Sequence, residues 1–204
     1  MDSNNINIKL LDEAVDRLGM LPGVGKKSAM RLALFLLRQP ESKVESLGRA
    51  LVNLRREIKY CSICNMLSED DLCPICRDST RDRSMICVVE TIRDVMSIEQ
   101  TGEYRGLYHL LGGLISPIDG IGPDDLPFNS LVERALSDEV KEVILAISGG
   151  MEGETTSYYI NKLLRDTGVR VSAIARGVGY GDHLEFADPM TLGISIRNRT
   201  TFGK

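Results

Sequence analysis

Four cysteines in two closely spaced pairs constrain this chain more than any other feature. They are Cys61, Cys64, Cys73 and Cys76, in a C-x2-C-x8-C-x2-C pattern. Two thiolates separated by two residues can bind one metal ion, and a second pair completes the tetrahedral shell that Zn²⁺ prefers. A redox dithiol is the alternative for a single pair, but two pairs favour metal. Four protein ligands leave no position open for water, so we predict one structural zinc ion in a module over residues 61–76.

The charge distribution differs on the two sides of this module. The 204-residue chain carries a formal net charge of −4. Residues 1–60 contain 11 Lys and Arg against 7 Asp and Glu, whereas residues 61–204 contain 14 against 22. This asymmetry indicates a basic binding end on an acidic body. The hydrophobic fraction of 43% is ordinary for a globular protein, so a core can form.

The start of the chain has no secretory pattern. Its first ten residues are mostly polar and contain no long apolar stretch. No apolar run is long enough to cross a bilayer. We therefore expect a soluble, cytoplasmic protein without membrane association. In that reducing compartment paired cysteines favour metal over disulfides.

Apolar residues recur at helical spacing in three segments before the cysteines. The first segment ends near Gly19, and the second covers residues 26–37 and stops before Pro40. Ser42 and Glu45 have capping-box spacing and would open the third helix. We expect this helix to bury one stripe of side chains: Val44, Leu47, Leu51, Leu54 and Ile58.

The turn between the first two helices has features of a phosphate-binding site. Gly23 and Gly25 allow positive φ and close approach of a ligand. The free N–H groups and the dipole at the start of the next helix favour an anion. Lys27 and Arg31 share a helix face, and Lys26 lies beside them. These groups would contact the DNA backbone and not the bases. An ordinary turn with solvated lysines is the alternative.

A nucleotide-binding P-loop is a third interpretation of the same turn. That motif requires a glycine five residues before Gly25, where Met20 stands, and Ser or Thr directly after its lysine. A helix also precedes this turn, where a P-loop has a strand. The spacing therefore excludes a P-loop.

After the cysteines the pattern alternates between strands and helices. Apolar runs predict buried strands over residues 85–89, 107–115, 143–147 and 169–175. Helices are predicted over residues 91–100, from about 129, over 155–166 and after Pro189. This alternation predicts an α/β domain with a parallel sheet. Cys87 lies within a strand and is expected to be a core thiol. His109 and His183 have no neighbouring nucleophile and are expected to be non-catalytic.

Acidic residues follow two of the predicted strands. Glu90 and Asp94 come after the first strand, and Glu152 and Glu154 come after the third. The carboxyl ends of adjacent parallel strands face one crevice, so these acids could converge there and bind Mg²⁺. The alternative is structural. Asp94 would complete a helix cap with Thr91, and Glu154 would sit at a helix N-terminus.

In this order, the hairpin, cysteine module and acids resemble the bacterial RecR family of recombination mediators. The resemblance covers nearly the whole length. It is carried by the four cysteines and by residues 21–29, 101–113, 116–123, 152–154 and 174–177. It implies an α+β chain of four parts: a helix-hairpin-helix domain (1–60), a zinc finger (61–76), an α/β Toprim domain (83–178) and a C-terminal tail with a helix (179–204).

The resemblance also implies a function without catalysis. Members form ring-shaped tetramers that can encircle single- or double-stranded DNA without sequence preference. They act with RecO, and in some bacteria RecF, to load RecA onto single strands coated with SSB, and so localise to the cytoplasm at the nucleoid. Lys27 and Arg31 match the family's DNA contacts. Glu90, Asp94, Glu152 and Glu154 match Toprim positions that also take part in RecO binding.

Two segments depart from the family pattern. Residues 148–150 are Ser-Gly-Gly where the family usually has Asn-Pro-Thr, and residues 179–186 differ from the usual stretch after Gly177. The extra glycines are expected to loosen the loop that carries Glu152 and Glu154.

Two other functions remain open at this point. One is a metal-dependent Toprim enzyme acting on DNA phosphodiesters, and the other is a structural zinc adaptor. The chain has no Trp and 10 aromatic residues in total, so base stacking is not expected to provide most of the DNA affinity.

Overall fold

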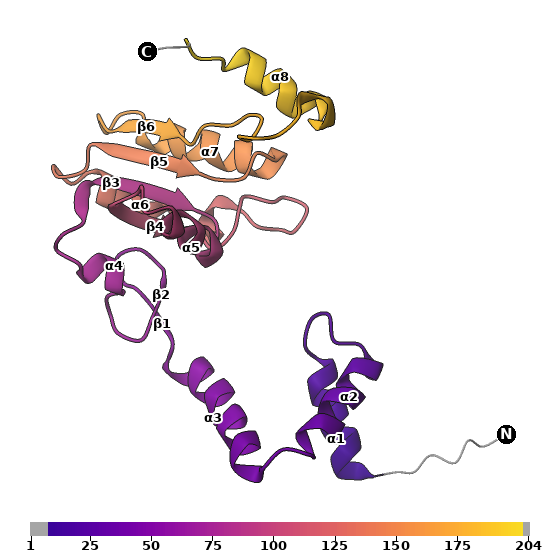
Figure 1. Cartoon of the computed structure of the whole chain (residues 1–204). Coiled ribbons are helices and arrows are strands. Elements are labelled where there is room, and N and C mark those ends of the chain that lie inside the picture. Colours follow the sequence, from indigo (N-terminus) through magenta and orange to yellow (C-terminus); the bar gives the residue numbers. More distant parts are fainter. Residues whose placement is uncertain (1–7, 202–204) are drawn as a thin grey trace. The chain divides into compact units, whose positions relative to one another are not determined.

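A computed structural model describes residues 8–201 and divides them into two compact units. The first unit ends at Ile58 and the second begins at Lys59. Figure 1 shows their elements in chain order. Among the described residues no helix combines the length and apolarity needed to cross a membrane.

The first unit contains three helices, α1 (Lys9–Gly19), α2 (Lys26–Leu36) and α3 (Glu41–Glu57). Helices α1 and α2 pack on each other around a small core of Val15, Ala29 and Ala33. Alanines at the contact let the two helices approach closely, and Leu11, Leu18 and Val24 cover the edges. The first two helices were predicted with nearly these bounds.

Helix α3 differs from the prediction in two respects. It begins at Glu41 with Pro40 as N-cap and no side-chain cap, so the predicted Ser42–Glu45 capping box is wrong. The predicted buried stripe is wrong as well, because no residue of α3 is buried and Leu51 and Leu54 are 61% and 60% exposed. Within the described chain no other element covers this face. Helical periodicity shows that a face is apolar, and it does not say which chain covers it.

The second unit starts with the cysteine module. A two-residue antiparallel pair, β1 (Lys59–Tyr60) and β2 (Leu67–Ser68), brings the first two cysteines into a turn. Asn65 adopts a positive φ of 65° in that turn. The short helix α4 (Pro74–Arg77) carries the last cysteine. Cys73 is the N-cap of α4, and its sulfur accepts a hydrogen bond from the Cys76 N–H at 3.4 Å.

Four parallel strands form the sheet of the second unit, in the order β4-β3-β5-β6. They are β3 (Asp82–Val89), β4 (Gly106–Leu110), β5 (Glu142–Ala146) and β6 (Arg170–Ala173). The central strands pair with Val88 opposite Leu145 and Val89 opposite Ala146. The α/β architecture with a parallel sheet is therefore confirmed, as is the C-terminal helix α8 (Pro189–Arg197).

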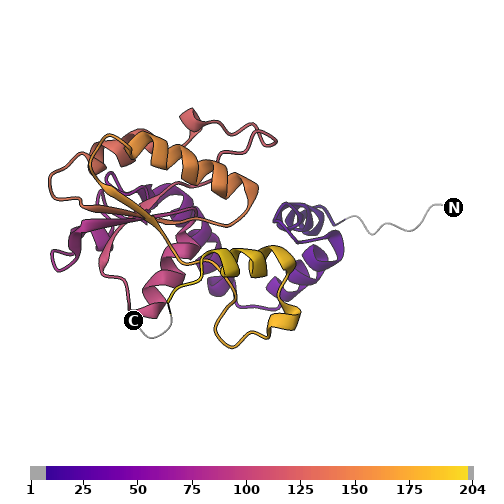
Figure 2. The same ribbon diagram turned by 90° about the horizontal axis from the view of Figure 1, so that it is seen from above.

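The two faces of the sheet have different covers. Ile86 and Val88 point toward helices α6 (Phe128–Ala135) and α7 (Met151–Leu164), where Leu131 and Ile160 are fully buried. On the other face, Cys87, Val89 and Tyr108 pack with α5 (Ile92–Thr101) and the cysteine module. Figure 2 shows α7 and α5 on opposite sides of the sheet. Both faces of the central strands are covered, which explains their continuous apolar sequence.

Several element ends differ from those expected. Strand β4 stops at Leu110, well before residue 115, and Gly112 follows with φ +77°. Helix α7 starts at Met151 and not at Thr155, because Gly150 takes the extended N-cap conformation. The α5 capping box between Thr91 and Asp94 is confirmed. The remaining described helical segments are the 3₁₀ turns at Pro123–Asp125 and Leu184–Phe186.

Candidate metal centre and nucleic-acid interface

The four paired cysteines form one compact cluster. Their sulfur atoms all lie within 4.8 Å of one another, and each residue is at most 3% exposed. The sulfurs of Cys64 and Cys73 are 3.5 Å apart. A tetrahedral zinc–thiolate shell with bonds of about 2.3 Å places its sulfurs about 3.8 Å apart. The four residues therefore fit a Zn²⁺ ion with only small side-chain adjustments.

The chemistry of the cluster also suits a metal. The hydrogen bond from Cys64 is the main cause that lowers the pKa of the Cys73 thiol to about 2. Its counterpart, the hydrogen bond to Cys73, raises the pKa of Cys64. A bound Zn²⁺ would keep all four sulfurs as thiolates. Cys87, the fifth cysteine, is a core thiol as predicted, and burial raises its pKa to about 12.

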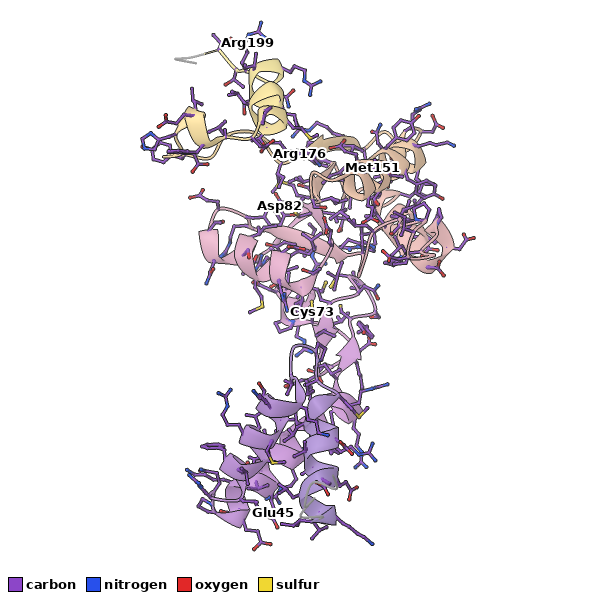
Figure 3. The ribbon with its side chains drawn as sticks, turned by 90° about the vertical axis from the view of Figure 1, so that its right-hand side faces the viewer. Glu45, Cys73, Asp82, Met151, Arg176 and Arg199 are labelled. Carbon is purple, nitrogen blue, oxygen red and sulfur yellow. The ribbon has the colours of Figure 1, made fainter. Side chains whose placement is uncertain are left out.

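The cysteine module has no separate core and packs directly on the sheet. The four cysteines share one apolar cluster with Val89, Tyr108 and Leu110. The Leu110 N–H, at the end of β4, donates to the Cys64 carbonyl at 2.9 Å. In Figure 3 Cys73 lies on the β4 side of the unit, whereas Arg176 and Met151 lie on the β6 side. The metal centre and the sheet are therefore one packing unit.

A buried histidine of β4, His109, pairs with an arginine of helix α6. Arg134 of α6 donates to the Tyr108 carbonyl at 2.8 Å, and its Nη1 is 3.1 Å from His109 Nδ1. Arginine only donates, so Nδ1 accepts and Nε2 carries the proton that His109 donates to the Pro127 carbonyl at 3.0 Å. Burial, followed by the Arg134 charge, lowers the pKa of His109 to about 4. These contacts place His109 in the core and give it a packing role.

The hairpin between α1 and α2 presents backbone and cationic groups together. Gly23 has φ +80°, and the Val24 N–H donates to the Leu21 carbonyl at 3.0 Å to close the turn. Gly25 is the N-cap of α2 and has no side chain with which to cap it. Lys26 and Lys27 in the first turn of α2 are exposed.

The basic residues of this hairpin have no acidic partners in the described chain. In residues 8–201, no ion pair involves Lys26, Lys27 or Arg31. An anion at this end of α2 would meet these charges together with the positive end of the helix dipole. The geometry therefore suits phosphate groups.

Glu90 and Asp94 both lie at the carboxyl end of β3 but have separate partners. The Glu90 carboxylate accepts a hydrogen bond from the Ser148 N–H, in the loop after β5. Asp94 accepts from the Thr91 N–H at 2.7 Å and from its hydroxyl at 2.9 Å. Asp94 thus serves the α5 cap, as the structural alternative predicted.

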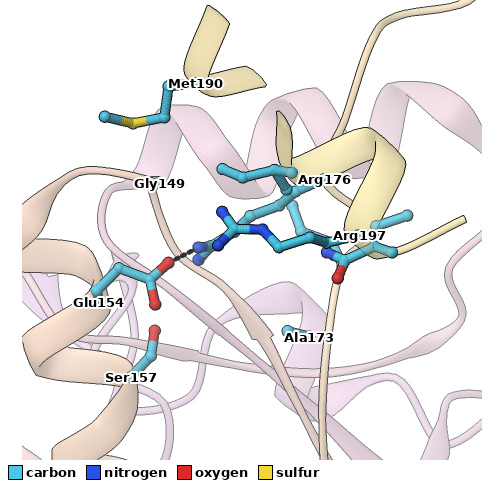
Figure 4. Close-up of a pocket in the computed structure, with 11 residues that line it drawn as sticks. Gly149, Glu154, Ser157, Ala173, Arg176, Met190 and Arg197 are labelled. Carbon is cyan, nitrogen blue, oxygen red and sulfur yellow. Dashed lines mark ion pairs between the residues drawn. The ribbon is translucent and has the colours of Figure 1, made fainter. Parts of the chain in front are cut away.

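Glu152 and Glu154 lie in the first turn of α7 and contact different neighbours. The Ser116 hydroxyl is within hydrogen-bond distance of both the Glu152 and the Asp119 carboxylates. Glu154 forms an ion pair with Arg176, which follows β6 (Figure 4). This ion pair borders a groove of about 890 Å³ between α7, the end of β6 and α8. Ser157, whose buried Oγ has no hydrogen-bond partner among the described residues, lies beside it.

The four acids share one edge of the sheet but do not form a metal-binding group. Within the described part of the chain, the cysteine cluster is the only set of three or more ligand side chains at metal-binding distances. Each acid is held by its own neighbour, so the edge contains several local contacts and no single cation site.

Comparisons with known proteins match every part of this architecture. A RecR helix-hairpin-helix profile matches residues 11–55, and a RecR profile for a zinc finger domain with four cysteines matches residues 58–78. A Toprim domain profile matches residues 84–175. The chain is 57% identical to the recombination protein RecR of Porphyromonas gingivalis over 194 residues, or 95% of this chain and 94% of that protein.

This chain belongs to the RecR family. The RecR proteins of Phocaeicola vulgatus and Flavobacterium johnsoniae are 56% and 50% identical to it, over 95% and 96% of its length and 94% and 95% of theirs. Its cysteine cluster is the family's four-cysteine zinc finger, which binds a structural zinc ion. The α/β sheet is the family's Toprim domain, and the α1–α2 hairpin is its helix-hairpin-helix.

Sequence reasoning about this RecR family member missed two groups at the acidic edge. Arg176 was part of the resemblance, but it was assigned no role, although its place directly after a strand indicated this edge. Ser148 stands where the family pattern departs, and its contact to Glu90 uses only its backbone N–H, which no side-chain signal reveals. The Ser-Gly-Gly loop is therefore held at both ends. Its first residue donates this hydrogen bond to Glu90, and its last residue, Gly150, is the N-cap of α7.

Proposed function

We propose that this protein is a non-enzymatic DNA clamp of recombinational repair. It helps RecO, with RecF in some bacteria, to load RecA onto single-stranded DNA coated with SSB. The observation that carries the proposal is the α1–α2 hairpin, where Lys26, Lys27 and Arg31, exposed and without an ion pair in residues 8–201, surround the open start of α2. Membership of the RecR family supports it.

Each part of the chain has a role in this proposal. Residues 1–60 bind DNA through the backbone groups of Gly23 and Gly25 and the nearby cations. Residues 61–76 hold the zinc ion, and residues 179–204 form the tail. Residues 83–178 form the Toprim domain, whose acidic edge serves RecO. A metal-dependent enzyme is less well supported, because each acid of this edge has its own structural partner.

The DNA contact can be tested by removing two charges from the hairpin. We expect the double variant Lys27→Ala, Arg31→Ala to bind both single- and double-stranded DNA at least about tenfold more weakly at about 0.1 M salt. The slope of log K against log salt should fall by about 2 for duplex DNA, because two phosphate contacts are lost. Fluorescence anisotropy at several salt concentrations measures both quantities.

A matched control carries the same loss of charge on another helix. Lys43→Ala, Arg49→Ala also removes two exposed cations, but from α3. It should change the salt slope much less. Equal losses in the two double variants would mean that general charge, and not the hairpin, binds the DNA.

We propose further that copies of this chain assemble into a tetrameric ring, and the bare apolar face of α3 supports self-association. A continuous exposed apolar stripe on a helix is typical of a protein–protein interface. Leu51→Glu together with Leu54→Glu should lower the mass observed by native mass spectrometry to that of smaller assemblies. Asn53→Glu, an exposed site on the opposite side of α3, should leave the assembly intact. An unchanged mass for the leucine variant would exclude α3 from the interface.

A further inference from the structure

Helix α2 carries a second feature beyond the hairpin cations. A groove of about 440 Å³ runs along its exposed side. It is lined by three cationic and three apolar residues: Lys27, Arg31, Arg38, Met30, Leu34 and Phe35. Lys27, Arg31 and Phe35 follow at intervals of four residues, so they share one face of the helix. The groove therefore combines positive charge with an aromatic ring.

Phe35 is not used by the core of its unit. Its side chain is 56% exposed, whereas the contact between α1 and α2 is made by Ala29 and Ala33 on the opposite side of α2. Among the described residues, its ring packs against no other aromatic ring. The groove contains no carboxylate, and Lys27, Arg31 and Arg38 form no ion pair within residues 8–201.

We propose that Phe35 stacks on an unpaired base of single-stranded DNA while Lys27, Arg31 and Arg38 contact the flanking phosphates. This inference rests on the proposed DNA-binding function and adds a preference for single strands to it. A nucleotide is a flat apolar ring attached to an anion, and this groove offers the complement of both. Most of the affinity for DNA still comes from the phosphate contacts, and the single ring adds the preference for single-stranded over duplex DNA.

The preference follows from where the bases lie in each form of DNA. In a duplex the bases are stacked on each other, so Phe35 can reach only the backbone. In a single strand a base can turn out and cover the ring. The cations act on both forms, because both carry phosphates. Loss of the ring should therefore weaken only single-strand binding.

The absence of tryptophan gives a direct test. Phe35→Trp in the full chain introduces one fluorophore at the proposed site. Its emission should be quenched when oligo(dT) binds, and much less when a duplex of equal length binds. Leu37→Trp places the fluorophore two residues away, at an exposed position on the other side of the helix. Its emission should respond little to either DNA. Equal quenching at both positions would overturn the stacking contact.

Affinity measurements provide the second arm. Phe35→Leu should bind oligo(dT) about tenfold more weakly than the unmodified chain and bind duplex DNA equally well. The unmodified chain should bind an abasic oligonucleotide of the same length as weakly as Phe35→Leu binds oligo(dT). Thermal melting checks that the variant is folded.

The possible failures are distinguishable. If Phe35→Leu binds oligo(dT) normally, the stacking proposal is wrong, while the Lys27 and Arg31 results still decide the DNA-binding function. If Phe35→Leu weakens binding to both DNA forms equally, Phe35 does not distinguish single-stranded from duplex DNA, and the stacking proposal is wrong. If it changes the mass of the assembly in native mass spectrometry, Phe35 lies at a contact between copies, which also overturns the proposal.

Discussion

Replacing Cys64 by alanine is expected to release the zinc ion and to destabilise the Toprim sheet together with the zinc finger. Apparent zinc-binding free energies in small fingers are about 10–16 kcal/mol near neutral pH, so three remaining cysteines cannot hold the module folded. Because the cysteines pack against Val89, Tyr108 and Leu110, its unfolding exposes one face of β3 and β4. We expect the melting temperature of the whole chain to fall by about 10 °C or more. Metal analysis and circular dichroism melting measure the two effects.

Cys87 provides the matched control for this experiment. It is as deeply buried as the ligands and belongs to the same apolar cluster, but it lies outside the group of four sulfurs. Cys87→Ala should therefore keep one zinc ion per chain and lose only about 1 kcal/mol of stability. If Cys64→Ala melted no earlier than Cys87→Ala, the sheet would not depend on the metal centre.

Replacing Gly153 by alanine is expected to be the most damaging single change at the acidic edge. A methyl group there would clash with the Ser148 carbonyl oxygen and would lie 2.9 Å from the carbonyl carbon. Backbone atoms cannot yield as a flexible side chain does, so the start of α7 and the loop after β5 must separate. Such overpacking costs about 3 kcal/mol. The movement should also break the hydrogen bond from the Ser148 N–H to Glu90, and urea denaturation with amide hydrogen exchange at Ser148 checks both results.

Gly149→Ala is the control for this second variant. A methyl group at Gly149 would meet no atom within 4 Å, and its φ is not in the left-handed region. Its stability should stay within about 0.5 kcal/mol of the unmodified chain. Equal stability of the two variants would show that the Ser148 carbonyl is not held against α7.

Features set by local chemistry could be predicted from the sequence. Two cysteine pairs specify a metal site almost by themselves, because only two residues separate each ligand from its partner. The capping box of Thr91 and Asp94 depends on groups three residues apart, and it forms as expected. Fully apolar runs such as Val88 and Val89 indicated strands buried on both faces, and the sheet is parallel.

Features that depend on distant contacts could not be predicted in the same way. The apolar stripe that contains Leu51 indicated a buried face, but its cover is absent from the described chain. The strand ends brought Glu90 and Glu154 to one edge, yet the pairing of Glu154 with Arg176 depends on how α7 meets the end of β6. The capping box of Ser42 failed because Pro40 is the N-cap of α3, two residues before the predicted cap.

The order of the strands has a consequence for the acidic edge. The chain proceeds outward from β3 to β4 and then returns to the other side of β3 as β5, so the topological switch point lies between β3 and β5. Open parallel sheets receive their ligands at such a point. Here the Glu90 carboxylate, after β3, accepts a hydrogen bond across the switch point from the Ser148 N–H, after β5. A ligand whose own oxygen accepts a hydrogen bond from this N–H would displace the Glu90 carboxylate. Ligand binding would therefore also free the negative charge of Glu90.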